Sequence, residues 1–220
     1  MRTLALLAAW WPGWWAGPAA GADRQVIDLA VERAVDGRWE TADPATVFRA
    51  GEWIRFRFRS AASGYLYVLN ETGDGKYLWL FPSAGAGTEN RIESRQEYLV
   101  PATEGGFLIP DKPGYDTVYW IVTPQQLPGG PGEIVRPPLK PARRPNTLRP
   151  RCREGPLRAR GVCVDSDAGA RPLAGQAQLP GSLLPDPAAA PPVFEPSAGG
   201  VRIVSLSGGL VVYEFRVAHR

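Results

Sequence analysis

Two cysteines and one histidine are the residues of this chain whose chemistry is easiest to interpret. Cys152 and Cys163 stand eleven positions apart, and such a pair in an oxidising compartment predicts a disulfide. Closing so short a loop would add about 2–3 kcal/mol to the free energy of unfolding. A redox or metal site would need more ligands than His219, which stands next to the C-terminal residue. The sequence therefore predicts no metal and no cofactor.

An active site is harder to assemble from these residues. A Ser-His-Asp arrangement would have to use His219, among the last residues, where chains fray. The chain has no Gly-x-Ser-x-Gly turn and no cluster of metal ligands. A glycosidase would need a pair of carboxylates, which spacing alone does not exclude. We expect a non-catalytic protein, with a hydrolase that uses a carboxylate pair as an alternative.

Three arginines at alternate positions are candidates for binding an acidic ligand. Apolar and basic side chains alternate strictly in residues 53–59, which indicates a strand that buries one face. The buried face is expected to hold Ile54, Phe56 and Phe58, and the outer face Arg55, Arg57 and Arg59. Such a stripe could bind an acidic glycan, although long arginines also form a solvated strand face that prevents edge pairing.

Aromatic side chains are the second group of candidates. Tyr and Trp give a large contact area with a polar end, so an exposed aromatic face would suit a sugar or a protein. The alternative is that they form core or structural cover, since one face of a sheet must be buried. The candidates are Tyr65, Tyr67, Tyr77 and Trp79, with Tyr115, Tyr119 and Trp120 further along the chain.

Short strands separated by Gly and Pro turns would position these residues. Residues 25–34 are interpreted as an edge strand, followed by a turn at Asp36-Gly37 and by Trp39 as a core anchor. Further strands are predicted at 53–59, 65–70, 77–81, 97–100, 107–109 and 117–123. This spacing favours an all-β fold, a β-sandwich-like domain of antiparallel sheets.

The first 22 residues have the features of a secretory signal peptide. The apolar residues 4–16 are too few to span a bilayer of ~30 Å, and the small residues 20–22 predict cleavage before Asp23. Four tryptophans in this segment leave an uncleaved interfacial anchor as the alternative. No later stretch reaches ~18 apolar residues. We expect a periplasmic or secreted mature chain without a transmembrane segment.

Four regions follow from these patterns: a signal peptide at 1–22, a β domain at 23–123, a Pro-rich insertion at 124–200 and a hairpin at 201–220. Proline at this density favours extended or irregular chain, so the insertion is predicted to be mostly irregular and pinned by Cys152 and Cys163. The hairpin, with a turn at Gly208-Gly209, is expected to pack on the β domain, because a strand pair cannot bury its apolar face alone.

Three short motifs resemble one family. They read FRAGE at Phe48–Glu52, GYLYVL at Gly64–Leu69 and LFPS at Leu80–Ser83. Together they resemble the domain of unknown function 4384, over about residues 45–123. The resemblance implies a bacterial envelope or secreted β domain, often fused to peptidase-like or kinase-like modules. No catalytic residue is established for the family, so the resemblance implies none here.

These observations predict an exported domain that acts by binding another envelope protein, through an aromatic face or a sheet edge. A module for cell-wall polymers or acidic glycans, using aromatic residues with the arginine stripe, is the alternative. Nucleic acid is not expected as a partner, because the formal net charge is only +3 and the chain is exported.

Overall fold

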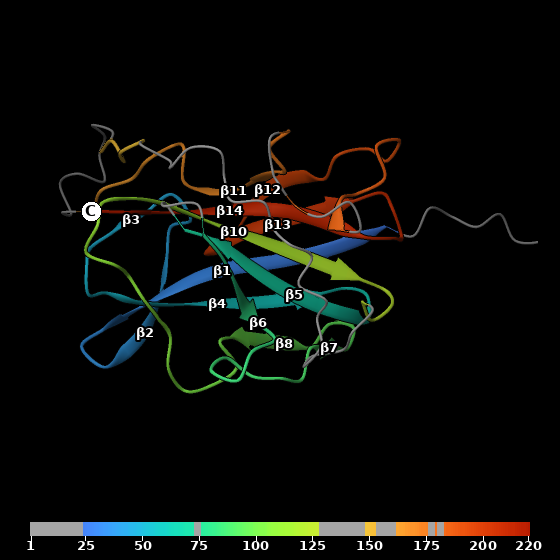
Figure 1. Cartoon of the computed structure of the whole chain (residues 1–220), viewed down its shortest axis with the longest axis horizontal. Coiled ribbons are helices and arrows are strands. Elements are labelled where there is room, and N and C mark those ends of the chain that lie inside the picture. Colours follow the sequence, from blue (N-terminus) through green and yellow to red (C-terminus); the bar gives the residue numbers. More distant parts are fainter. Residues whose placement is uncertain (1–23, 73–75, 128–147, 153–161, 176–178, 180–182) are drawn as a thin grey trace, which may run out of the picture.

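The computed structural model describes residues 24–72, 76–127, 148–152, 162–175, 179 and 183–220. The predicted signal peptide lies outside them. The described residues form two β-sheets and no α-helix (Figure 1). The predicted all-β, sandwich-like fold is therefore confirmed. Within the described residues, no helix is long and apolar enough to cross a membrane.

The first sheet has the strand order β12-β13-β1-β4-β8, with β2 paired to β1 and β9 paired to β4. Its members are β1 (Gln25–Val35), β2 (Arg38–Ala42), β4 (Trp53–Ser60), β8 (Glu97–Val100), β9 (Phe107–Leu108), β12 (Val193–Ser197) and β13 (Gly200–Ser205). All its pairings are antiparallel. The predicted turn at Asp36-Gly37 joins β1 to β2, with φ angles of 49° and 76° that suit a two-residue hairpin loop.

The second sheet has the order β11-β14-β10-β5-β6, with β3 paired to β14 and β7 paired to β5. Its members are β3 (Val47–Phe48), β5 (Gly64–Glu71), β6 (Tyr77–Phe81), β7 (Arg91–Ile92), β10 (Gly114–Thr123), β11 (Gly169–Pro172) and β14 (Val211–His219). Its pairings are antiparallel except that of β3 with β14, which is parallel.

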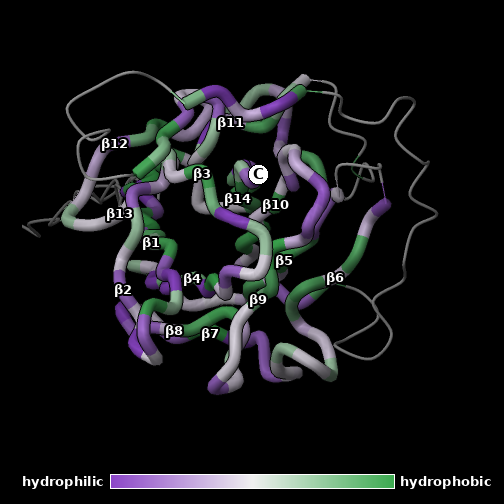
Figure 2. Tube along the Cα trace, turned by 90° about the vertical axis from the view of Figure 1, so that its left-hand side faces the viewer, coloured by the Kyte–Doolittle hydropathy of each residue, from purple (hydrophilic) through white to green (hydrophobic). Residues whose placement is uncertain are grey.

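The core between the sheets is built on aromatic rings. Trp120 of β10 is fully buried, stacks on Phe58 with ring centroids 5.7 Å apart, and meets Phe56 edge to face at 5.2 Å. Tyr213 of β14 also stacks on Trp120, at 6.4 Å. Figure 2 views the same layers from the side, with β1 and β4 in one and β10 and β14 in the other. The predicted orientation of Phe56 and Phe58 into the core is confirmed.

Six predicted strands are present, as β4, β5, β6, β8, β9 and β10. The interpretation of residues 25–34 as an edge strand is wrong, because β1 has β13 on one side and β4 on the other. Ile27, Leu29 and Val31 face the core. The alternation is imperfect because the opposite face carries the apolar Val26 and Ala30 as well as Asp28 and Glu32. Trp39 is not a core anchor either. It lies half-buried on β2, with the Arg55 guanidinium 4.4 Å from its ring centre.

The Pro-rich segment is more ordered than predicted in the part that the structure describes. It supplies β11 to the second sheet and β12 to the first. Both strands contain proline, and both lie at sheet edges, where a missing backbone N–H costs no ladder bond. Leu179 and Leu183 of the same segment are buried against the second sheet. Part of this segment therefore belongs to the domain.

The predicted C-terminal hairpin is wrong, although both of its strands pack on the β domain as expected. β13 pairs with β1 and β12 in the first sheet, whereas β14 pairs with β10 and β11 in the second. The connection that contains Gly208-Gly209 therefore passes between layers. β14 is buried on both faces along nearly its whole length, so it is a central strand rather than half of a surface hairpin.

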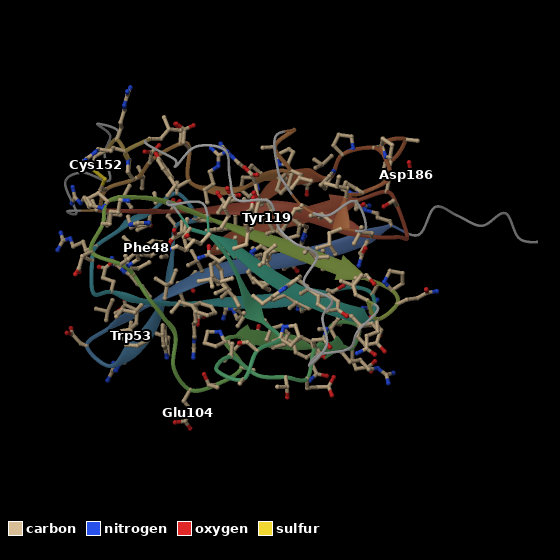
Figure 3. All side chains as sticks on the ribbon, in the orientation of Figure 1. Phe48, Trp53, Glu104, Tyr119, Cys152 and Asp186 are labelled. Atoms are coloured by element: carbon tan, nitrogen blue, oxygen red, sulfur yellow. A yellow bond between two sulfur atoms is a disulfide. The ribbon has the colours of Figure 1, made fainter. Side chains whose placement is uncertain are left out.

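The predicted disulfide between Cys152 and Cys163 is present, with Cα atoms 5.0 Å apart. Cys152 lies at the end of the molecule where the chain ends (Figure 3). The Cys163 carbonyl accepts a hydrogen bond from the Val47 amide at 2.8 Å, and Arg220 Nη1 lies 3.4 Å from Cys152 Sγ. Hydrogen bonds of the two bridged cysteines thus connect the Pro-rich segment to β3 and to Arg220, the residue after β14.

Candidate binding surface

β6 forms one edge of the second sheet, and all five of its residues are apolar or aromatic. Among the described strands it pairs with β5 alone, from Glu71 opposite Tyr77 to Val68 opposite Phe81. Its Leu78 side chain is 54% exposed. Figure 2 places β6 at the outer side of the described chain, away from the first sheet. An edge of this kind offers unpaired backbone N–H and C=O groups beside apolar surface.

The other strands that end the two sheets carry features that disfavour addition of a further strand. Charged side chains and proline in an edge strand both have this effect. The residues concerned are Glu195 and Pro196 in β12, Glu97 in β8, and Arg171 and Pro172 in β11. β6 contains neither a charge nor a proline. Of the four strands that end the described sheet orders, β6 alone is open to an added strand.

The four aromatic candidates do not form one exposed platform. Tyr67 is buried on the outer face of the second sheet, and Leu179 and Leu183 of the Pro-rich segment contribute to the cluster around it. Tyr65, Tyr77 and Trp79 are half-buried at the rim of this cluster. Tyr67 is therefore part of the buried structure, as the alternative interpretation predicted. Of the four candidates, only Tyr65, Tyr77 and Trp79 remain partly accessible. No sequence pattern indicated which leucines would form the cover.

Trp79 links the rim to the covered cluster. Its ring meets that of Tyr67 edge to face at 6.3 Å, and its indole N–H has no acceptor among the described residues. A buried indole N–H usually has a hydrogen-bond partner. β6 thus combines an exposed leucine, half-buried aromatic rings and an unused donor on a single edge strand.

The hydroxyls of the covered face have structural partners. Tyr67 Oη accepts a hydrogen bond from the Leu127 amide at 2.9 Å, and the Tyr119 hydroxyl donates to Glu71 Oε2 at 2.6 Å. Burial, followed by this bond to Glu71, raises the pKa of Tyr119 far above its usual value, so its proton stays in place. Glu214, also close to Tyr119, is buried and accepts from the Ala174 amide at 3.2 Å. Glu71 and Glu214 therefore each accept a hydrogen bond that stabilises the fold, from Tyr119 and from the Ala174 amide respectively.

The predicted arginine stripe lies on the outer face of β4 as expected, but acidic residues of β1 neutralise much of it. Glu32 accepts from Arg55 Nε at 2.7 Å and lies 3.5 Å from Arg57 Nη1. Asp28 accepts from Arg59 Nη2 at 2.9 Å and from Arg202 of β13 at 2.8 Å. The stripe is thus a ladder of ion pairs across three strands.

The pKa of Asp28 reflects this ladder. Burial by itself would raise the pKa, but the hydrogen bonds from Arg202 and Arg59 hold it below its ordinary value. Asp28 therefore stays ionised. Asp28 and Glu32 on one face of β1 were the only sequence feature that could have indicated these ion pairs. They become informative only once β1 is known to lie beside β4.

His219 is not at a frayed terminus. It is buried in β14, and its Nε2 lies 3.6 Å from Asp116 Oδ2. Burial lowers its pKa, and this shift is partly offset by the Asp116 carboxylate and by the Lys112 backbone. In the part of the chain that the structure describes, no three His, Cys, Asp or Glu residues are placed to hold a metal ion.

Residues 47–126 match the family model of the domain of unknown function DUF4384, and the predicted resemblance is confirmed over that segment. The matched segment runs from β3 to just beyond β10 and contains all of β6. No curated protein and no solved structure gives a significant match. β1 and β14, which pair with β4 and β10 of the matched segment, both lie outside it.

Proposed function

We propose that this chain, whose residues 47–126 belong to DUF4384, is an exported, non-catalytic binding domain that engages another envelope protein through β6. The observation that carries the proposal is the composition of this edge, with five apolar or aromatic residues, no charge and no proline. Native proteins ordinarily protect an exposed edge strand of this length and apolarity, because it invites pairing. A partner that covers β6 would provide that protection.

The expected mode of binding is addition of a strand. An extended segment of the partner would lie alongside β6 and bond to backbone groups on the outer edge of Leu78–Phe81. Leu78 would pack against apolar side chains of that segment. The partner segment should therefore be extended and apolar at alternate positions.

Export and a periplasmic or secreted location are part of the same proposal. The disulfide is consistent with an oxidising compartment, in which such bonds persist. The basic, apolar and small-residue regions of residues 1–22 supply the corresponding signal. Both features favour a partner in the envelope rather than in the cytosol.

Capture from an envelope extract tests this function with a matched pair of variants. Leu78 of β6 and Leu108 of β9 are 54% and 55% exposed, and both lie on strands with a free edge. We expect Leu78→Lys to abolish capture of the partner, because it places a charge on the docking edge. Leu108→Lys adds the same charge to the other sheet and should leave capture unchanged.

Amide hydrogen exchange on the purified complex locates the contact. Slower exchange in residues 77–81 is expected, since a partner strand would bond to these amides. Equal capture by both variants, or protection confined to another part of the chain, would refute the proposed edge. Concentration-dependent self-association abolished by Leu78→Lys, with no captured protein, would replace the envelope partner with a second copy of the chain.

A further inference from the structure

We propose that a polar hollow on the outer face of the first sheet, centred on Ala30, binds the carboxylate of an acidic sugar. The hollow lies on a different sheet from β6, so it stands independently of the function proposed above. It is formed by side chains of β1, β4, β8 and β13 and by the turn that joins β12 to β13. The polar residues that line it are Asp28, Arg57, Arg59, Glu97, Ser197 and Arg202.

The hollow exists because small residues interrupt the ladder of ion pairs. Ala30 lies between Asp28 and Glu32 on the same face of β1, opposite Arg57 of β4, and Ala198 adds a second short side chain. Gly200 sits so close to β1 that an added Cβ would lie 2.3 Å from the Leu29 carbonyl oxygen. No side chain from that position can fill the space. The volume is about 340 Å³, near the lower end of the roughly 300–1,000 Å³ usual for ligand pockets.

Arg57 is the least satisfied of the lining arginines. Its guanidinium lies 3.5 Å from Glu32 and 3.8 Å from Glu97, and it makes no hydrogen bond among the described residues. Its side chain is 36% exposed. Arg59 and Arg202 each use one nitrogen on Asp28 and direct no other hydrogen bond to a described residue. Guanidinium donors thus remain available around the hollow.

The charges that line the hollow favour a singly charged anion. Three arginines face two carboxylates, Asp28 and Glu97, which leaves one net positive charge. A guanidinium can donate two parallel hydrogen bonds to a carboxylate, and this geometry suits Arg57. A doubly charged phosphate would be repelled more strongly by the two acidic side chains.

The remaining lining groups suit the hydroxyls of a sugar. Glu97 is 60% exposed and can accept hydrogen bonds from hydroxyl groups, while the Ser197 hydroxyl can donate or accept. A ligand that carries one carboxylate and several hydroxyls would use both kinds of partner. A sugar acid has this composition, whereas an apolar carboxylic acid would leave the acceptors of the wall unused.

Binding of glucuronate and of galacturonate to the full exported chain tests the site, with glucose as the neutral control. Amide chemical shifts in residues 28–30, 57–59 and 197–202 should move with either acid and stay still with glucose. Arg57→Gln should weaken binding about tenfold, since it removes a charge-assisted contact. Ala30→Leu fills the hollow without changing the charge, and it should abolish binding.

The matched control is Arg38→Gln, which removes the same charge from an exposed position on β2 outside the hollow. It should bind as the unmodified chain does. An equal loss in Arg38→Gln and Arg57→Gln would reduce the effect to overall charge and overturn the site. Binding that survives Ala30→Leu, or shifts produced equally by glucose, would also overturn it. Circular dichroism of each variant confirms that the fold is kept.

Discussion

The Tyr115 hydroxyl donates a hydrogen bond to Asp165 Oδ2 over 2.6 Å, and both residues are buried. Tyr115 belongs to β10, whereas Asp165 follows Cys163 in the Pro-rich segment. The Asp165 carboxylate also accepts from the Asp167 amide at 2.9 Å, and its own amide donates to the Ala45 carbonyl at 2.8 Å. Asp165 therefore attaches the Pro-rich segment to the second sheet.

Tyr115→Phe should lower the free energy of unfolding by about 1–3 kcal/mol, because the buried Asp165 carboxylate loses its hydroxyl donor and keeps only the Arg151 and Asp167 amides. Urea denaturation followed by tryptophan fluorescence measures the change. Tyr65→Phe is the matched control, since the Tyr65 hydroxyl makes no hydrogen bond within the described residues. A similar loss in the two variants would show that the bond to Asp165 contributes nothing specific.

Acid should weaken the attachment at Asp165. Burial alone would raise the pKa of this carboxyl, but hydrogen bonds from Tyr115 and from the amides of Asp167 and Arg151 hold it below the ordinary value of 3.8. A lowered folded-state pKa contributes stability that is present above 3.8 and is lost as the pH falls through the folded value. Asp165→Asn should lack this loss. Unfolding free energies of the two proteins across that interval should therefore converge at low pH.

His219 should add a second acid-dependent loss at higher pH. Its pKa is lowered from 6.5 mainly by burial, so the unfolded chain takes up a proton more readily than the folded one. Stability should be complete above 6.5 and should fall as the pH drops towards the folded-state pKa. Titration of the imidazole by nuclear magnetic resonance measures the pKa directly. A value at or above 6.5 would contradict the assignment of a buried, neutral histidine.

The disulfide should contribute to stability through the loop it closes. Replacing Cys152 and Cys163 together by serine should lower the free energy of unfolding by about 2–3 kcal/mol. Thermal and urea denaturation of the double variant measure this loss. The unmodified chain treated with a reductant should show the same change, and a reduced chain as stable as the oxidised one would contradict the prediction.

The exported chain should begin at Asp23. β1 starts at Gln25 and is a central strand, so cleavage before Asp23 leaves the whole of β1 intact. Intact-mass measurement of the protein recovered from the envelope fraction tests this position. Recovery of the full-length mass with the membrane would instead support the interfacial anchor.

The sequence predicts local structure well wherever one strand shows its own pattern. Ile54, Phe56 and Phe58 alternate with arginines, and this pattern alone identified both faces of β4. Such a pattern could not identify which strands pair with one another. β1 is central because it pairs with residues 201–205, and β13 and β14 occupy different sheets, facts that depend on contacts across nearly the whole chain.

The candidate surfaces were predicted less completely for the same reason. The arginines of β4 suggest a basic stripe until Asp28 and Glu32 of β1 are placed beside them. Tyr67 suggests a platform until Leu179 and Leu183 cover it. β6 was identified as a strand, but its position at an edge is a property of the assembled sheet.

The placement of β1 and β14 bears on the proposed export of the chain. β1 is the first strand of the domain and pairs with β13, and β14 is the last and joins β10 to β11. A polypeptide translocated from its N-terminus delivers β14 only at the end. The first sheet is complete only once β13 has been delivered, and the second only once β14 has been. Such contacts between distant residues make folding slow. We therefore expect the chain to stay unfolded through the whole of translocation, in the state that a narrow export channel requires.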